Sequence, residues 1–246
     1  MWDDPRKLNA IALLLVAAAA ALLAWGGIAW AVRQPAFVIR RVVLDAPLVR
    51  VNPAHIAAVV REELRGTFFT MRLDETRASL QRVPWVKSIA LRRRWPDRLE
   101  VSVTEHEPLA RWNDSGLVDT EGEAFSADFD GELPQFTGPD GSAAQVVARF
   151  RDFGAALATR SLAISELQLS PRGAWRLRTT GGASLTIELG RSAPGEQLSR
   201  FAANYARTVG ALARSGTRVE HVDLRYRNGF AVRVPGFVEK APGRGG

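Results

Sequence analysis

The chain has 246 residues, of which 46% are hydrophobic and 24% charged, and 33 Lys and Arg residues outnumber 26 Asp and Glu residues. At roughly 100–200 residues per domain, this length predicts one or two modest domains. The absence of cysteine excludes disulfides, thiol nucleophiles and cysteine-ligated metal sites. The three histidines, His55, His106 and His221, have no metal-binding spacing, so we expect neither a metal nor a cofactor.

The positive charge is not concentrated in one place. The formal net charge is +7 at pH 7, but the arginines are spread along the chain without a long basic tract. The densest cluster, Arg92 to Arg94, lies between an apolar strand pattern and a turn, which favours a solvated edge or a partner surface. We therefore predict no nucleic-acid partner.

A long apolar segment lies near the N-terminus. Residues 10–32 contain no charge, and as a helix these 23 residues would be about 34 Å long, enough to cross a hydrocarbon core of ~30 Å. Trp25 and Trp30 lie toward its far end, where indole rings favour the membrane interface. A cleavable signal peptide is the alternative, but its apolar region is typically only about 7–15 residues long. We favour an uncleaved anchor.

A first small unit follows the anchor. Asn52 and Pro53 are typical of a helix start and Gly66 of a helix end, while Asp74 is a candidate cap for a second helix that ends before Pro84. Alternating and β-branched residues predict the strands. The expected elements are a strand at 37–44, helices at 52–66 and 74–84, and strands at 86–91 and 99–105. Their order is β-α-α-β-β.

The pattern changes after residue 108 to short strands, two amphipathic helices and further strands. The expected elements are strands at 110–112, 117–119 and 124–126, a helix at 142–162, strands at 164–169, 174–179 and 183–189, a helix at 195–214, and strands at 219–225 and 229–234. The predicted fold class is α+β: an apolar helix, the β-α-α-β-β unit, and a mixed α/β unit with an antiparallel-rich sheet and two helices. We expect the tail to be disordered.

No catalytic constellation emerges from the sequence. Acidic residues cluster in turn-rich sequence, where we interpret them as solvated loop residues: Asp119, Glu121, Glu123, Asp128 and Asp130. The chain lacks a G-x-S-x-G elbow and a phosphate-binding loop. The histidines are interpreted as isolated surface or half-buried side chains. We predict that the protein is not an enzyme.

The closing segment, residues 222–234, is the candidate binding edge. A final strand with one unpaired side offers its N–H and C=O groups to another chain. Arg225 and Tyr226 are residue types enriched at binding hot spots. In the equally weighted alternative, Tyr226 fills a corner of the core and Arg225 forms a local ion pair.

Several segments together resemble the FtsQ/DivIB family of bacterial division proteins. They are VPWVKSIALRRRWPDRLEVSVTEHEPLARW at 83–112, LVDTEGEAFS at 117–126, TGPDGS at 137–142 and VDLRYRNGFAV at 222–232. The resemblance runs from the anchor to about Val234. It implies a cytoplasmic head, a transmembrane anchor, a POTRA domain, a β domain and a disordered tail, over residues 1–9, 10–32, 33–107, 108–234 and 235–246.

The resemblance also implies a role. Such proteins are single-pass inner-membrane proteins of type II, with a cytoplasmic N-terminus and a periplasmic body, located at the division septum. They are non-catalytic scaffolds that recruit the FtsB–FtsL coiled-coil pair, and through it septal peptidoglycan synthesis. The resemblance suggests that the POTRA domain contacts other divisome proteins through the face near residues 83–95.

The family's partner-binding positions map onto the last strand and its approach. The partner, FtsB, adds to this strand beside an arginine and a tyrosine that match Arg225 and Tyr226. The positions carried over are Arg191, Arg225, Tyr226, Asn228, Gly229, Phe230, Val232 and Val234. Val234 stands where some relatives have an aromatic residue.

Two alternatives remain open at this point. A periplasmic POTRA module that assists outer-membrane protein assembly or secretion would share the first domain. That class usually has several such units or a following barrel, whereas the sequence after Pro108 contains two amphipathic helices. An anchored cell-wall hydrolase would need Asp119 and Glu121 as a carboxylate pair.

Overall fold

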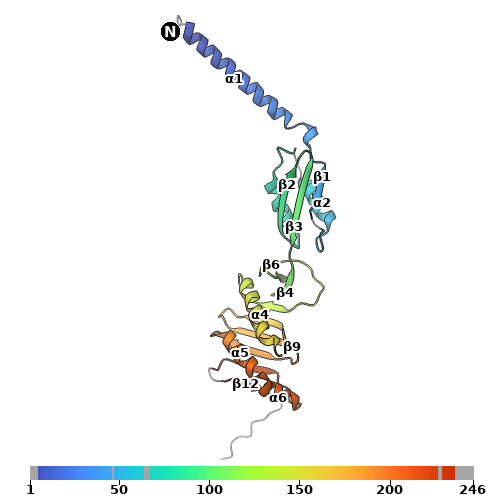
Figure 1. The fold of residues 1–246 in the computed structure, drawn as a ribbon, viewed down its shortest axis with the longest axis vertical. Helices are drawn as coiled ribbons and strands as arrows, with labels where there is room; N and C mark the ends of the chain where they lie inside the picture. Colours follow the sequence, from blue (N-terminus) through green and yellow to red (C-terminus); the bar gives the residue numbers. More distant parts are fainter. Residues whose placement is uncertain (1–4, 46, 64–66, 227–228, 236–246) are drawn as a thin grey trace, which may run out of the picture. The chain divides into compact units, whose positions relative to one another are not determined.

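The computed structural model describes the chain except for residues 1–4, 46, 64–66, 227–228 and 236–246. The chain divides into two compact units, Met1–Glu105 and His106–Gly246 (Figure 1). Gly66, predicted to end a helix, and the predicted disordered tail from 236 onward lie outside the described residues.

The first unit begins with one long apolar helix, α1, which runs from Pro5 to Ala31. Its segment Asn9–Ala31 has 23 residues, and by length and composition it can cross a membrane. None of this segment is buried within the protein, and Trp25 and Trp30 are exposed. The predicted span at 10–32 differs from this segment by one residue at each end.

A three-stranded sheet and two helices follow α1. The sheet has the order β1-β3-β2, with β1 parallel and β2 antiparallel to the central strand β3. Buried side chains of the helices and strands form one core, which includes Ile56, Val60, Leu80, Leu99 and Val101. The β-α-α-β-β order is confirmed. The elements are the 3-10 turn η1 Pro35–Phe37, β1 Arg41–Leu44, α2 Pro53–Glu63, α3 Leu73–Leu80, β2 Val86–Arg94 and β3 Arg98–Glu105.

Local interactions explain where the elements of this unit begin as predicted from the sequence and where they do not. The Asn52 cap is confirmed, because its side-chain oxygen accepts a hydrogen bond from the backbone N–H of Ala54 at 2.9 Å. The Asp74 cap is wrong. Helix α3 begins at Leu73 after Arg72, so Asp74 lies in its first turn, where a negative charge complements the helix dipole. The first strand starts later than predicted, because the 3-10 turn η1 precedes it.

The carboxylate of Glu105 organises the loop before α2. It accepts hydrogen bonds from the backbone N–H groups of Val49, Arg50 and Val51 at 3.1, 3.0 and 2.7 Å. Burial acts to raise the pKa of Glu105, but these bonds outweigh it, led by the one from Val51, and the pKa lies below its ordinary value.

This lowered pKa predicts an acid-sensitive first unit. The stabilisation by Glu105 is present above the ordinary pKa of 4.5 and is lost as pH falls through the lower folded-state pKa. We therefore expect Glu105→Gln to lower the unfolding midpoint at pH 7 and to flatten its dependence on pH below about 4.5. Denaturant titrations of both proteins between pH 7 and pH 3 measure this. Parallel pH profiles for the variant and the wild type would contradict the assignment.

The second unit contains a nine-stranded sheet with helices packed against it. Its order is β12-β11-β10-β9-β8-β7-β4-β5-β6, with more antiparallel than parallel neighbours. Figure 1 shows α4 and α5 beside the strands in this part of the chain. The strands are β4 Pro108–Trp112, β5 Gly116–Asp119, β6 Ala124–Phe125, β7 Gln135–Thr137, β8 Leu162–Leu169, β9 Trp175–Gly181, β10 Thr186–Gly190, β11 His221–Asp223 and β12 Ala231–Arg233.

Helices α4 (Ala143–Ala158) and α5 (Pro194–Asn204) supply much of this unit's core. Helix α4 contacts β8 and α5 contacts β10. Phe153 and Leu157 of α4 and Phe201 of α5 are fully buried, as the helical spacing of apolar residues predicts.

Three predictions for the second unit need correction. The helix at 142–162 ends at Ala158, and β8 begins at Leu162. The helix at 195–214 is interrupted by a 3-10 turn, η2 Tyr205–Arg207, before α6 Val209–Arg214. Thr208 lies at the break, with its hydroxyl donating to the carbonyl of Asn204 at 2.8 Å. Strand β7 was not predicted, because it has only three residues.

Candidate partner-binding edge

Strand β12 forms one edge of the nine-stranded sheet. It pairs antiparallel with β11, with Val222 opposite Val232 and Asp223 opposite Ala231, and no strand among the described residues pairs with its other side. All three residues of β12 are exposed. The edge therefore presents unpaired backbone groups, which can accept an additional strand.

Arg225 stands beside this edge in a fixed orientation. Its Nε donates to Oδ1 of Asp223 at 2.9 Å, and one terminal nitrogen donates to Oδ2 at 2.6 Å. The side-chain hydrogen bond from Arg225 is the main cause that holds the pKa of Asp223 below its ordinary value, and the same bond raises the pKa of Arg225. The Arg225 side chain is nevertheless 62% exposed. The pair thus orients a permanent positive charge toward solvent.

Gly190 supports the stem of this arginine, and sequence reasoning missed it. Its φ of +70° favours glycine, and a Cβ at this position would lie 3.1 Å from Cγ of Arg225. Arg191, a predicted site residue, follows directly and is exposed. The sequence signal was the Leu189-Gly190 pair at the end of a strand, which by itself says nothing about a residue 35 positions later.

Tyr226 is exposed rather than part of the core. Its side chain is 58% exposed, whereas the preceding Leu224 is buried. Both line a groove of about 500 Å³ that also includes Phe201 of α5, together with Gly229 and Phe230. Of the two readings left open, the core reading is therefore wrong for Tyr226, while the local ion pair of Arg225 is present and leaves it accessible.

The remaining predicted positions divide into exposed and packed residues. Gly229 and Val232 are exposed. Phe230 and Val234 are partly buried against the core, and the Phe230 ring lies 5.5 Å from that of Phe201. Asn228 lies outside the described residues. The packed position of Val234 makes it a support of the edge rather than an exposed rim.

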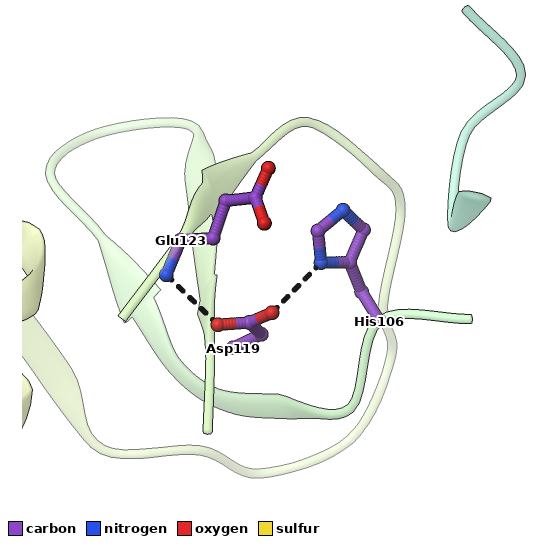
Figure 2. Close-up of side chains that lie close together, drawn as sticks. All are labelled: His106, Asp119 and Glu123. Atoms are coloured by element: carbon purple, nitrogen blue, oxygen red, sulfur yellow. Dashed lines mark hydrogen bonds and ion pairs between the residues drawn. The ribbon is translucent and has the colours of Figure 1, made fainter. Parts of the chain in front are cut away.

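His106, Asp119 and Glu123 form a second polar cluster (Figure 2). Asp119 ends β5, which lies next to the edge strand β6 at the other end of the sheet order from β12. Asp119 is fully buried, and its Oδ1 accepts hydrogen bonds from the backbone N–H groups of Glu121 and Glu123 at 2.9 and 2.8 Å. Nδ1 of His106 lies 3.0 Å from Oδ2 of Asp119, and the ring stacks on Phe125 at 4.1 Å. The interpretations of Asp119 as a solvated loop residue and of His106 as an isolated imidazole are therefore wrong.

The same three side chains are the group of the described residues best placed to hold a metal ion, since their ligand atoms lie within 4.8 Å of one another. The hydrogen bonds of Asp119 also join the β5–β6 turn to the start of the unit, which gives Asp119 and His106 a structural role.

Comparison with known families decides the class of the protein. Residues 110–225 match the model "Cell division protein FtsQ/DivIB, C-terminal", and residues 37–106 match the model "POTRA domain, FtsQ-type". The chain belongs to the FtsQ/DivIB family. The match to the C-terminal model ends at Arg225, so β12 lies beyond it.

Curated relatives agree over most of the chain. The cell division protein FtsQ of Burkholderia pseudomallei is 39% identical over 241 residues, which cover 96% of both chains. That of Bordetella pertussis is 34% identical and covers 95% of this chain and 93% of its own. That of Escherichia coli is 36% identical over 172 residues, 68% of this chain and 62% of its own. Together with helix α1, these relatives indicate a single-pass membrane protein of cell division.

Proposed function

We propose that this protein is a non-catalytic scaffold of the divisome that recruits the FtsB–FtsL pair and thereby links early division proteins to septal peptidoglycan synthesis. Its N-terminus is cytoplasmic, and its POTRA domain and β domain lie in the periplasm, at the septum. The observation that carries the proposal is the exposed edge strand β12 with Arg225 and Tyr226 beside it.

The edge supplies two kinds of interaction. A strand of FtsB added to β12 forms main-chain hydrogen bonds, which set its register. Arg225 adds a charge-assisted bond to an acidic residue of the partner, and Tyr226 adds apolar contact area above the groove. Confinement of both proteins to one membrane raises their effective concentration, so a modest contact suffices.

The other parts fit the same role. The first unit contacts further divisome proteins, as the resemblance suggested for the face near residues 83–95. Asp119, the candidate for hydrolase chemistry, is buried and bound to two backbone amides, so its carboxylate is committed to the fold. Family membership favours septum assembly over the transport alternative.

The test is binding of the full chain to the FtsB–FtsL complex in lipid nanodiscs. Arg225→Ala removes the charge-assisted bond to the partner, so we expect it to raise Kd about tenfold or more. Tyr226→Ala is expected to weaken binding as well, without affecting the core, because this side chain is exposed.

Arg172→Ala is the matched control, since Arg172 is exposed in the turn between β8 and β9, away from β12 in the sheet order. Thermal unfolding of each variant verifies that the fold is retained. If Arg225→Ala and Tyr226→Ala bind FtsB–FtsL as tightly as Arg172→Ala does, the proposed edge is wrong.

A further inference from the structure

One end of the first unit gathers aromatic and arginine side chains that the proposed role of β12 does not use. Three segments meet there: the residues that follow α1, the connection from Thr67 to Arg72, and the turn between β2 and β3. We call this surface the aromatic–arginine rim. Its members are Phe37, Phe68, Phe69, Trp95, Arg40, Arg41, Arg92, Arg94 and Arg98.

The first two segments are held together at the end of the apolar helix. The Thr67 hydroxyl donates to the carbonyl of Val32 at 2.6 Å, and the backbone N–H of Phe68 donates to the carbonyl of Phe37 at 2.7 Å. Val32 is the residue that directly follows the apolar segment Asn9–Ala31. The connection before α3 therefore touches the chain at the point where it leaves the span.

The third segment is joined to the other two. A terminal nitrogen of Arg93 in β2 donates to the carbonyl of Met71 at 2.6 Å. The backbone N–H of Arg40 donates to the carbonyl of Asp97, in the β2–β3 turn, at 2.9 Å. The tip of the hairpin thus lies at the same end of the domain as Phe37 and Phe68.

Two of the four aromatic members are exposed, and the other two are half-buried beside one of them. Trp95 is 73% exposed and Phe69 is 47% exposed. The rings of Phe37 and Phe68 lie 5.3 and 5.2 Å from that of Phe69 in edge contacts. Large exposed aromatic side chains are costly in water, but they are favoured at the boundary between lipid headgroups and acyl chains.

The depth of the span supports this location. Its 23 residues are about 34 Å long as a helix, slightly more than a hydrocarbon core of ~30 Å. Val32 therefore lies at headgroup level when α1 spans the bilayer, and Thr67, which is bonded to it, lies there too.

The charge of the rim has the sign that attracts anionic lipids. All five of its arginines are exposed. The nearby carboxylates are Asp97, which pairs with Arg41 at 3.5 Å, and Glu100, which pairs with Arg94 at 3.1 Å. Arginine therefore remains in excess, and a basic patch next to a membrane span binds acidic headgroups.

We propose that the aromatic–arginine rim rests on the bilayer surface, with Phe69 and Trp95 at the acyl boundary and the arginines against anionic headgroups. The contact fixes the POTRA domain against the membrane, so that α1 is not its only attachment. It is independent of β12 and of the partner bound there.

The absence of cysteine makes a direct test possible, because one introduced cysteine carries a unique label. The full chain with Trp95→Cys or Phe69→Cys, labelled with an environment-sensitive fluorophore, is reconstituted in vesicles of phosphatidylcholine alone or mixed with phosphatidylglycerol. Each kind of vesicle is prepared with and without brominated acyl chains. Each variant leaves the other aromatic residue in place. Trp95 is the more telling site, since it lies 63 positions after Val32 in the chain.

Val49→Cys is the matched control. Val49 is an apolar residue that is 81% exposed. Its backbone N–H donates a hydrogen bond to the side chain of Glu105, the last residue of β3, whereas the rim lies at the start of β3, next to Asp97. We expect brominated lipid to quench the labels at 69 and 95 at least about threefold more than the label at 49. Equal quenching at 95 and 49 overturns the proposal and leaves the rim as a surface for a protein partner.

A second arm separates the contributions of rings and charges. In the Trp95→Cys background, Phe68→Ser with Phe69→Ser is expected to reduce quenching in all vesicles. Arg94→Glu with Arg98→Glu is expected to reduce it only in vesicles that contain phosphatidylglycerol. Quenching that both pairs of substitutions leave unchanged would show that the label reaches lipid without the rim, and would also overturn the proposal.

Discussion

Replacing Asp119 with alanine is expected to destabilise the second unit by about 3–5 kcal/mol. The carboxylate is fully buried and accepts hydrogen bonds from two backbone N–H groups and from the imidazole of His106. Removing it leaves these donors without their acceptor in a site closed to water, at a cost of about 1–3 kcal/mol for each donor that stays unsatisfied.

Two further variants sharpen this expectation. Asp119→Asn keeps the oxygen that accepts the amides of Glu121 and Glu123, and its NH₂ group can donate to Nδ1 of His106 in the other tautomer, so a smaller loss of about 1 kcal/mol is expected. Glu123→Gln is the control, because its backbone N–H is unchanged and its side chain is exposed. Denaturant midpoints, together with hydrogen exchange at residues 121 and 123, measure the series. An Asp119→Ala midpoint equal to that of Glu123→Gln would refute the structural role.

The same cluster shows why part of the molecule could not be predicted. In the sequence, Asp119 precedes a polar turn, which is the usual context of a solvated carboxylate. Its burial depends on His106, 13 residues earlier, and on the ring of Phe125, which stacks on that histidine. A pattern of neighbouring residues contains no information about such an enclosure.

The elements themselves were predictable where burial is periodic. The alternation in β3 and the apolar face of α4 give regular signals, and both elements are present. The break after α5 gives no such signal. It depends on the hydroxyl of Thr208 and on the close approach of Gly210 to the carbonyl oxygen of Tyr205, which would lie 3.0 Å from a Cβ at position 210. Helical spacing continues through it in the sequence.

The candidate edge divides in the same way. Arg225 and Tyr226 could be chosen from residue type and from resemblance, and both are exposed. Gly190 could not, because its contact with Arg225 joins separate strands through a positive φ. Phe230 is partly buried against Phe201, so a substitution there would disturb the core as well as the edge. A test of the edge alone needs an exposed residue.

Gly229 is that residue, and Gly229→Trp is expected to weaken binding of FtsB–FtsL at least about 100-fold while leaving the unfolding midpoint unchanged. A Cβ at Gly229 meets no described atom within 4 Å, and its φ lies outside the left-handed region, so the fold itself does not require glycine. The position lines the groove beside Tyr226. A bulky ring here would fill part of the groove just before β12, so we expect it to obstruct a strand that adds to this edge.

Gly154→Trp is the matched control, because a Cβ at Gly154 of α4 also meets nothing within 4 Å. Binding measured in nanodiscs should be lost for Gly229→Trp and retained for Gly154→Trp, with both proteins unfolding at the wild-type midpoint. Retained binding in Gly229→Trp would mean that the partner does not pass this end of the sheet. The exposure of Arg225 and Tyr226 would then need another explanation, because Gly229 lines the same groove as Tyr226 and lies just before β12.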